Sequence, residues 1–218
     1  RLILAIVRSI KQDPECRGLI VASRLNLYDA LPYPLGWGMD RRGGSEADLT
    51  EPLRLVGDLI EAGVELFAFT MGNPYYVPHI NRPFDQKQAG AQETPLQGCD
   101  RLIRGVAAVQ AAYPEIPMVG LGFSWFRDFG PSVAANALRR RGLSMAGFGR
   151  QSIAYPDLPA DLLQQGKIEP GKCCTTCGMC SELKANFCVS GCVTRDSEVY
   201  LPIYRQYRAD KQAGMNEG

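Results

Sequence analysis

Short apolar runs and longer stretches with a helical period alternate along this chain. The apolar runs predict strands at 19–22, 66–69, 118–121 and 143–146. Apolar positions spaced by three or four residues predict helices over 3–10, 50–62, 96–113, 133–140 and 159–166. Short, continuously apolar strands are typical of parallel sheets covered on both faces. Strands that alternate with helices favour right-handed βαβ units, and hence a parallel α/β sheet.

Helix-terminating residues support these boundaries. Thr50 is the expected N-cap of the second helix, with Pro52 in its first turn and Gly63 just past its end. Pro114 stops the third helix, and Gly142 ends the fourth. Because a side-chain oxygen at the N-cap binds a free backbone N–H and glycine accepts the left-handed conformation past the last turn, these residues belong at helix ends.

Four βα units are compatible with a small open sheet or with half of a (β/α)8 barrel. The glycine-rich and polar segments follow the strands, on the side where barrel enzymes place their active sites, which favours the barrel. We therefore predict an α/β fold: residues 1–167 as half a TIM barrel and residues 168–218 as a cysteine-rich segment with a polar tail. The chain begins at Arg1, within a predicted helix, which indicates a fragment.

Composition narrows the classes of partner. The formal net charge of +1 over 218 residues gives no field that favours nucleic acid or an anionic membrane. An apolar run at 2–7 is broken by Arg8, and no run approaches the ~20 residues that span a bilayer. We expect a cytoplasmic protein that binds neither nucleic acid nor membrane and acts on a small molecule.

Four closely spaced cysteines are the strongest chemical signal in the chain. Two C-x2-C steps share a cysteine, and a fourth cysteine follows later, at Cys174, Cys177, Cys180 and Cys192. Four thiolates suit a [4Fe–4S] cluster or a structural zinc ion, and three in quick succession favour the cluster. Cys173 and Cys188 are then spare. A disulfide framework is the weaker alternative, since nothing indicates secretion.

Glycines after the last two strands indicate a phosphate site. Gly120 lies in the third strand with Gly122 just after it, and the turn 147–150 follows the fourth. Backbone N–H groups exposed by glycine can approach phosphate oxygens, and Arg150 adds a charge-assisted fork. In barrels, a phosphate site frequently lies after these two strands.

Three segments and the cysteine run resemble the old yellow enzyme family of NAD(P)H:flavin oxidoreductases. The stretch GFGRQSIAYPD at 147–157 resembles its eighth strand, and LIVASR at 19–24 its fifth. The loop GNPYYVPHINRP at 72–83 follows the expected sixth strand. The cysteines resemble the iron–sulfur branch, which includes dienoyl-CoA reductase and trimethylamine dehydrogenase, although dienoyl-CoA reductases have one more residue before the third ligand.

The resemblance implies an FMN-binding TIM barrel of which this chain supplies strands five to eight, and so half of an active site that is inactive alone. Arg24 would reach the flavin pyrimidine edge. The FMN phosphate would be held by Gly122, Phe123, Gly149 and Arg150. The [4Fe–4S] cluster would be ligated by Cys174, Cys177, Cys180 and Cys192.

His79 is the only histidine, and with Arg82 it matches a His-x-x-Arg that follows strand six in dienoyl-CoA reductases. The implied reaction is reduction of an activated C=C bond of an enone or enoyl thioester, with NAD(P)H as electron donor and His79 assisting protonation. Amine dehydrogenation with the same two cofactors and a non-catalytic zinc fragment are the alternatives. Open edges of a half-barrel would favour homo-oligomers.

Overall fold

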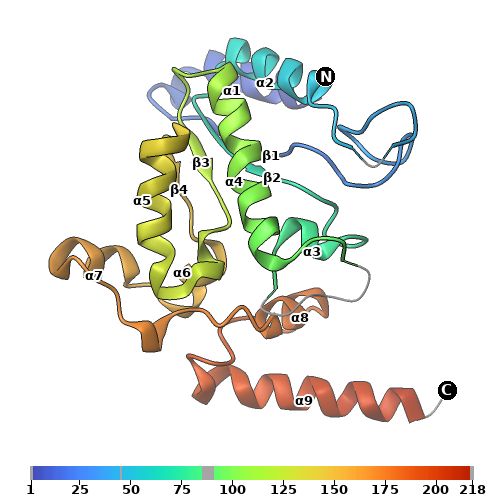
Figure 1. Ribbon diagram of the computed structural model, residues 1–218, viewed down its shortest axis with the longest axis vertical. Coiled ribbons are helices and arrows are strands. Elements are labelled where there is room, and N and C mark those ends of the chain that lie inside the picture. Colours follow the sequence, from blue (N-terminus) through green and yellow to red (C-terminus); the bar gives the residue numbers. More distant parts are fainter. Residues whose placement is uncertain (1, 45, 85–90, 217–218) are drawn as a thin grey trace. The chain divides into compact units, whose positions relative to one another are not determined.

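The computed structural model divides the chain into two compact units (Figure 1). It describes residues 2–44, 46–84 and 91–216. The first unit comprises Arg1–Phe123 with Ser132–Gly147, and the second comprises Ser124–Pro131 with Phe148–Gly218. The domain boundary predicted at residue 167 lies within the second unit.

A parallel sheet forms the centre of the first unit. Its described strands lie in the order β1-β2-β3-β4 and span Ala22–Asn26, Leu66–Thr70, Met118–Gly120 and Met145–Ala146. This arrangement confirms the predicted α/β class and the parallel pairing. Because βαβ crossovers are right-handed and this strand order never reverses, the connecting helices belong on one face of the sheet.

The two faces of the sheet differ in burial. Pairing aligns Arg24 with Ala68, Ala68 with Val119, and Val119 with Met145, so these side chains share one face. On that face Arg24 and Met145 are exposed. The other face carries fully buried side chains, Phe67, Phe69 and Met118. Burying each of these contributes about 1.5–3 kcal/mol, so the helix-covered face supplies the core.

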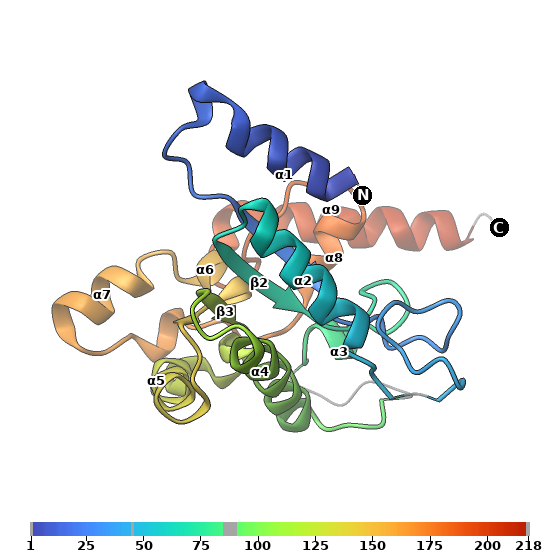
Figure 2. The ribbon, with the colours of Figure 1, turned by 90° about the horizontal axis from the view of Figure 1, so that it is seen from above.

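Helices and short helical turns fill the remainder of the first unit. They are α1 (Leu2–Gln12), η1 (Pro14–Cys16), α2 (Thr50–Ala62), α3 (Pro78–Asn81), α4 (Pro95–Ala112) and α5 (Gly130–Arg141), whose first two residues belong to the second unit. Thr94 and Gln97 form a capping box at the start of α4, which fixes that end. Tyr113, just past α4, donates a 2.8 Å hydrogen bond from its hydroxyl to the Leu53 carbonyl of α2. Figure 2 shows α2 and α4 beside each other against the sheet.

Three details of the predicted elements are wrong, and the first is β4, which begins at Met145 rather than Leu143. The first strand begins at Ala22 rather than Leu19, and Leu19 is 56% exposed. Pairing with β2 sets the strand position, and it starts opposite Leu66. The N-cap of α2 is Leu49, without a side-chain cap; Asp48 accepts the Thr50 N–H at 2.9 Å instead. Gly63 does end α2 in the left-handed conformation, at φ +113°.

The second unit is helical in its described part. Its elements are η2 (Phe123–Phe129), whose first residue belongs to the first unit, α6 (Gly149–Ala154), α7 (Leu158–Gln165), η3 (Pro170–Lys172), α8 (Met179–Ala185) and α9 (Ser197–Asn216). Tyr155, Leu158 and Cys173 form a small buried core, with Ile168 packed against it. The Tyr155 hydroxyl donates to Asp161. This core joins α6 and α7 to the start of the cysteine segment.

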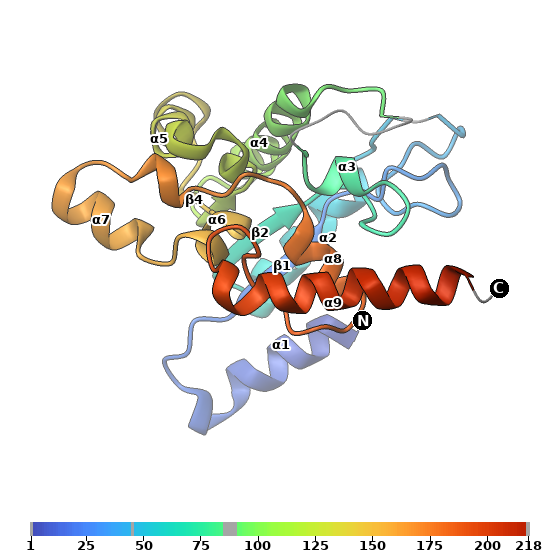
Figure 3. The same cartoon turned by 90° about the horizontal axis from the view of Figure 1, so that it is seen from below.

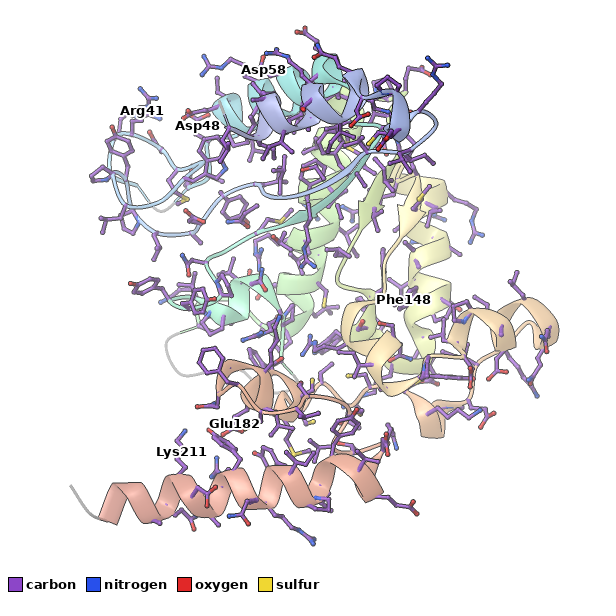
Figure 4. The ribbon with its side chains drawn as sticks, turned by 180° about the vertical axis from the view of Figure 1, so that it is seen from behind. Arg41, Asp48, Asp58, Phe148, Glu182 and Lys211 are labelled. Atoms are coloured by element: carbon purple, nitrogen blue, oxygen red, sulfur yellow. The ribbon has the colours of Figure 1, made fainter. Side chains whose placement is uncertain are left out.

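The C-terminal segment predicted as a polar tail is a helix, α9, which runs continuously past α8 (Figure 3). Glu182 of α8 accepts hydrogen bonds from Tyr204 at 2.7 Å and Arg208 at 3.0 Å. Figure 4 shows Glu182 facing α9. These polar anchors were invisible in the sequence because they pair residues more than twenty positions apart. In the described residues, no helix combines the length and the apolar character required to cross a bilayer.

Candidate functional site

The four predicted ligand cysteines line one small cavity of the second unit. They come from the loop after η3, from α8 and from the segment before α9. The rest of the wall is formed by Arg150, Ile153, Thr175, Gly178 and Val193. The four cysteines therefore line the same cavity, and their role as metal ligands stays a prediction. Ile153 and Val193, which make part of the wall apolar, were missed because single apolar residues carry no signal.

Unusual backbone conformations bend the chain around this cavity. Thr176 has a φ of +55°, and Gly178, the N-cap of α8, has a φ of +85°. A non-glycine residue in this region costs about 1–3 kcal/mol. Thr176 is also 1% exposed, and its hydroxyl has no hydrogen-bond partner in the described part of the chain. The loop thus contains a residue with a strained backbone and a buried hydroxyl between Cys174 and Cys177, which both line the cavity.

Gln151 joins α6 to the cysteine loop, and sequence reasoning missed it. Its side chain is fully buried, and its Oε1 accepts the backbone N–H of Cys174 at 2.8 Å. The Gln151 N–H donates to the Ser124 hydroxyl at 3.3 Å. Its Nε2 has no partner among the described residues. No local signal could have found it, because Gln151 precedes Cys174 by 23 residues and its burial appears only in the fold.

The thiols have different electrostatic surroundings. Burial raises the pKa of the Cys174 thiol, and the neighbouring Cys180 and Cys192 raise it further, against a Thr176 N–H and the charge of Arg150. Burial also acts to raise the pKa of Cys177, but the Met179 N–H and the Thr194 hydroxyl outweigh it and lower the value. Cys180 and Cys192 therefore lie near enough to Cys174 to influence the pKa of its thiol.

The spacing of the sulfurs bears on the kind of centre. A tetrahedral zinc ion with Zn–S bonds of about 2.3 Å would draw its sulfurs to within roughly 4 Å of one another. Among the described residues, no three His, Cys, Asp or Glu side chains converge tightly enough to hold a metal ion. A four-iron cluster takes one thiolate per iron, so its ligands surround a wider space. The described cysteines thus form no group already arranged to hold a metal ion, and the choice between a cluster and zinc rests on donor chemistry and sequence spacing.

The two spare cysteines lie outside the cavity wall. Cys173 is buried in the Tyr155 core, with its Sγ 3.5 Å from the Glu169 carbonyl oxygen. Cys188 has its Sγ 3.5 Å from the Asn186 carbonyl oxygen. Their separate surroundings support their assignment as non-ligands.

The residues predicted to hold FMN are divided between the two units. Gly122 and Phe123 follow β3 and belong to the first unit. Gly149 and Arg150 follow β4 and belong to the second unit. Gly122 has a φ of +106°, which favours glycine. No heavy atom lies within 4 Å of where a Cβ on Gly149 would be, so its backbone is open to approach. Arg24 is exposed on the uncovered face of the sheet.

His79 lies on α3, a single helical turn within the long segment predicted as a loop. It is half-buried, whereas the neighbouring Tyr75 and Tyr76 are 89% and 74% exposed. The Gly72 N–H donates to the Tyr28 carbonyl at 2.7 Å, which ties the start of this segment to the one after β1. Residues 85–90 of the predicted loop lie outside the described residues.

Arg101 of α4 is hydrogen-bonded to the segment that contains His79. Its Nη2 donates to the Ile80 carbonyl at 2.7 Å and to Glu93 at 2.7 Å, and its Nε donates to Glu93 at 2.9 Å. Its Nη1 is 3.3 Å from the Tyr28 hydroxyl. Burial acts to lower the pKa of Arg101, but Glu93 outweighs it and raises the value. This half-buried clamp joins both loops at the carboxyl ends of β1 and β2.

Comparison with known proteins leaves the family open. The sequence matches none of the protein-family models against which it was scanned, and no curated protein matches it.

Proposed function

We propose that this chain is part of an FMN-dependent oxidoreductase of the ene-reductase type with a [4Fe–4S] cluster. The observation that carries the proposal is the meeting of four cysteines at one cavity of the second unit. When bound, FMN supplies hydride transfer and the cluster supplies single-electron transfer. The resemblance to the old yellow enzyme family, on the segments named above, supplies the reaction class.

The sheet supports assignment as half of a (β/α)8 barrel. A strand order that never reverses gives the singly wound arrangement of barrels, whereas doubly wound sheets reverse it. Parallel sheets are ordinarily covered on both faces, yet Arg24 and Met145 are exposed on one face here. Closure with four further βα units would turn that face into a barrel interior. Arg24 would then face the interior, near the carboxyl ends of the strands.

The candidate flavin residues have suitable chemistry. Arg24 would stabilise negative charge at the pyrimidine edge of the flavin. The open backbone at Gly149 and the positive φ at Gly122 suit close approach of phosphate oxygens. Arg150 would add charge for the phosphate, and it also lines the cysteine cavity.

The second unit fits a cluster by its donors. All four cavity cysteines carry soft sulfur, which iron–sulfur clusters take as ligands. Two buried donors adjacent to Cys174, the Thr176 hydroxyl and the Gln151 amide, lack partners among the described residues. Sulfur atoms of a cluster would accept hydrogen bonds from such donors. We assign Cys174, Cys177, Cys180 and Cys192 as the ligands.

His79 would hold the proton that the substrate carbon takes up. An imidazole can hold and give up a proton, and a half-buried position on a short helix gives His79 both support and access. The Arg101 clamp on the adjacent Ile80 carbonyl fixes the backbone beside it.

The test is anaerobic turnover of the complete enzyme with NAD(P)H and an α,β-unsaturated ketone. We expect the flavin absorbance to bleach with NAD(P)H and return with the ketone, giving a saturated product. His79→Gln should slow reoxidation about 100-fold or more while leaving reduction unchanged, because only protonation is affected. Tyr76→Phe, on the same segment and exposed, is the matched control.

Other products would overturn this assignment. An aldehyde with a shortened amine, and no reduced ketone, would show amine dehydrogenation instead. A colourless protein with stoichiometric zinc would show a non-catalytic metal module. A holoenzyme whose flavin never turns over would rule out the reaction altogether.

A further inference from the structure

A second and larger cavity lies in the first unit, beside the start of α2. It occupies about 530 Å³, within the range of small-molecule sites. The loop after β1 forms one wall, and the first turns of α2 form the other. Its lining residues are Tyr33, Pro34, Gly36, Trp37, Gly38, Met39, Arg41, Asp48, Thr50, Glu51 and Arg54. Figure 4 shows Arg41 and Asp48 on the loops next to α2.

Hydrogen bonds preform the loop wall. Trp37 donates its Nε1–H to the Asn26 carbonyl at 3.0 Å and its backbone N–H to Asp29 at 2.9 Å. A Cβ on Gly36 would lie 2.0 Å from the Leu31 carbonyl oxygen, so only glycine allows this close packing. The wall is thus anchored to the end of β1 and does not need a ligand to form.

The cavity contains cations with little compensation. Arg41 approaches Glu51 only to 3.8 Å, with its side chain 74% exposed, and such a pair contributes little. Arg54 has no ion pair or hydrogen bond to any residue that the structure describes. Hydrogen bonds from the Thr50 hydroxyl and N–H lower the pKa of Asp48, and the charge of Arg41 lowers it further, so Asp48 offsets part of the Arg41 charge. Two guanidinium groups are therefore available to an anion.

Aromatic and acidic groups complete the lining. The Arg41 guanidinium lies 6.0 Å from the centre of the Tyr33 ring, and Trp37 provides a second aromatic surface. A planar ring can stack on these surfaces. The Asp48 and Glu51 carboxylates can accept hydrogen bonds from sugar hydroxyls, but they would repel a purely anionic ligand such as a dicarboxylate.

We propose that this cavity binds a nucleoside phosphate, with the base against Tyr33 and Trp37 and the phosphate between Arg41 and Arg54. An apolar ligand would leave the guanidinium groups without partners and without water, which is unfavourable. A nucleotide combines a stacking ring, hydroxyl donors and a compact anion, matching all three kinds of group. This inference concerns a site separate from the candidate flavin and cluster residues and does not depend on them.

Isothermal titration calorimetry of the purified chain with ADP, adenosine and pyrophosphate tests the proposal. We expect ADP to bind at least about tenfold more tightly than adenosine or pyrophosphate, because each lacks one set of contacts. Arg54→Gln should weaken ADP about tenfold and leave adenosine unchanged. Tyr33→Ala should weaken both ADP and adenosine. Arg8→Gln, another exposed helical arginine, is the control and should change nothing.

Two results would overturn the inference. Absence of heat with millimolar ADP would show that the cavity does not take this class of ligand. ADP binding that Arg150→Gln abolishes and Arg54→Gln leaves intact would locate the nucleotide at the candidate flavin residues instead. Because no step needs flavin or iron, failure here leaves the proposed reductase untouched, and failure of the reductase leaves this site standing.

Discussion

Replacing Arg101 tests whether the clamp at the carboxyl ends of β1 and β2 holds the His79 segment. Arg101→Met keeps the length of the side chain and its helix propensity but removes every donor. The Glu93 carboxylate and the Ile80 carbonyl would lose their hydrogen bonds, which now measure 2.7–2.9 Å. The side chains of Arg101 and Glu93 are only 22% and 20% exposed, so water compensates poorly.

The magnitude follows from that burial. Removing one partner of a fully buried ion pair costs about 3–5 kcal/mol, whereas an exposed pair is worth about 0–1 kcal/mol. Because about one-fifth of each side chain is exposed, we expect Arg101→Met to lower the free energy of unfolding by about 2–4 kcal/mol. Arg104→Met is the matched control: it lies on the same helix and pairs with Asp100 at 2.6 Å, but its side chain is 66% exposed. It should cost about 0–1 kcal/mol.

Urea denaturation monitored by circular dichroism measures the loss of unfolding free energy in both variants. Amide hydrogen exchange of residues 72–84 shows whether the destabilisation lies in the His79 segment. We expect faster exchange in that segment for Arg101→Met only. Equal losses for the two variants, or unchanged exchange at 72–84, would refute the clamp. The double variant with Glu93→Gln should cost less than the sum of the single changes, since both remove the same bonds.

Three further changes test other parts of the fold. Gly72→Ala should destabilise by about 1–3 kcal/mol, seen in thermal melts, because φ is +79° and the new Cβ would lie 2.4 Å from an Ile80 methyl; an unchanged melt would contradict this. Lys11 and the Val21 N–H lower the pKa of Glu65 below 4.5, so its contribution is complete above about pH 4.5 and lost as pH falls through the folded value. Glu65→Gln should reduce the loss of unfolding free energy at acid pH. A stability–pH profile identical to that of the parent would contradict this role of Glu65. Gln151→Leu should cost about 1–3 kcal/mol by leaving the Cys174 N–H unpaired, and a melt matching the parent would show otherwise.

The sequence predicted the sheet well because its signals are local. The β2 strand is a short apolar run, and α4 has a helical apolar period and begins with a capping box. Both lie within one residue of their predicted bounds. The position of β1 was wrong because its register depends on pairing with β2, some forty residues away. The helical state of α9 was missed because its contacts with Glu182 join residues 22 and 26 positions apart.

Within the candidate site, spacing predicted which cysteines meet, because C-x2-C steps bring thiols together in one turn of loop. Spacing could not predict Gln151 or the apolar wall, which depend on how α6 packs against that loop. The clamp at Arg101 was also hidden, since it joins four segments separated by up to 73 residues. Tertiary contacts therefore decide the supporting residues, whereas the local motif singled out the four cysteines that line the cavity.

The central claim is that four cysteines of the second unit hold one iron–sulfur cluster. Anaerobic reconstitution with iron and sulfide, followed by iron and acid-labile sulfide analysis, tests it directly. We predict about four irons and four sulfides per chain, lost in Cys192→Ala and kept in Cys188→Ala, whose thiol lies outside the cavity. Incorporation of zinc without iron, or equal iron in both variants, would contradict the account.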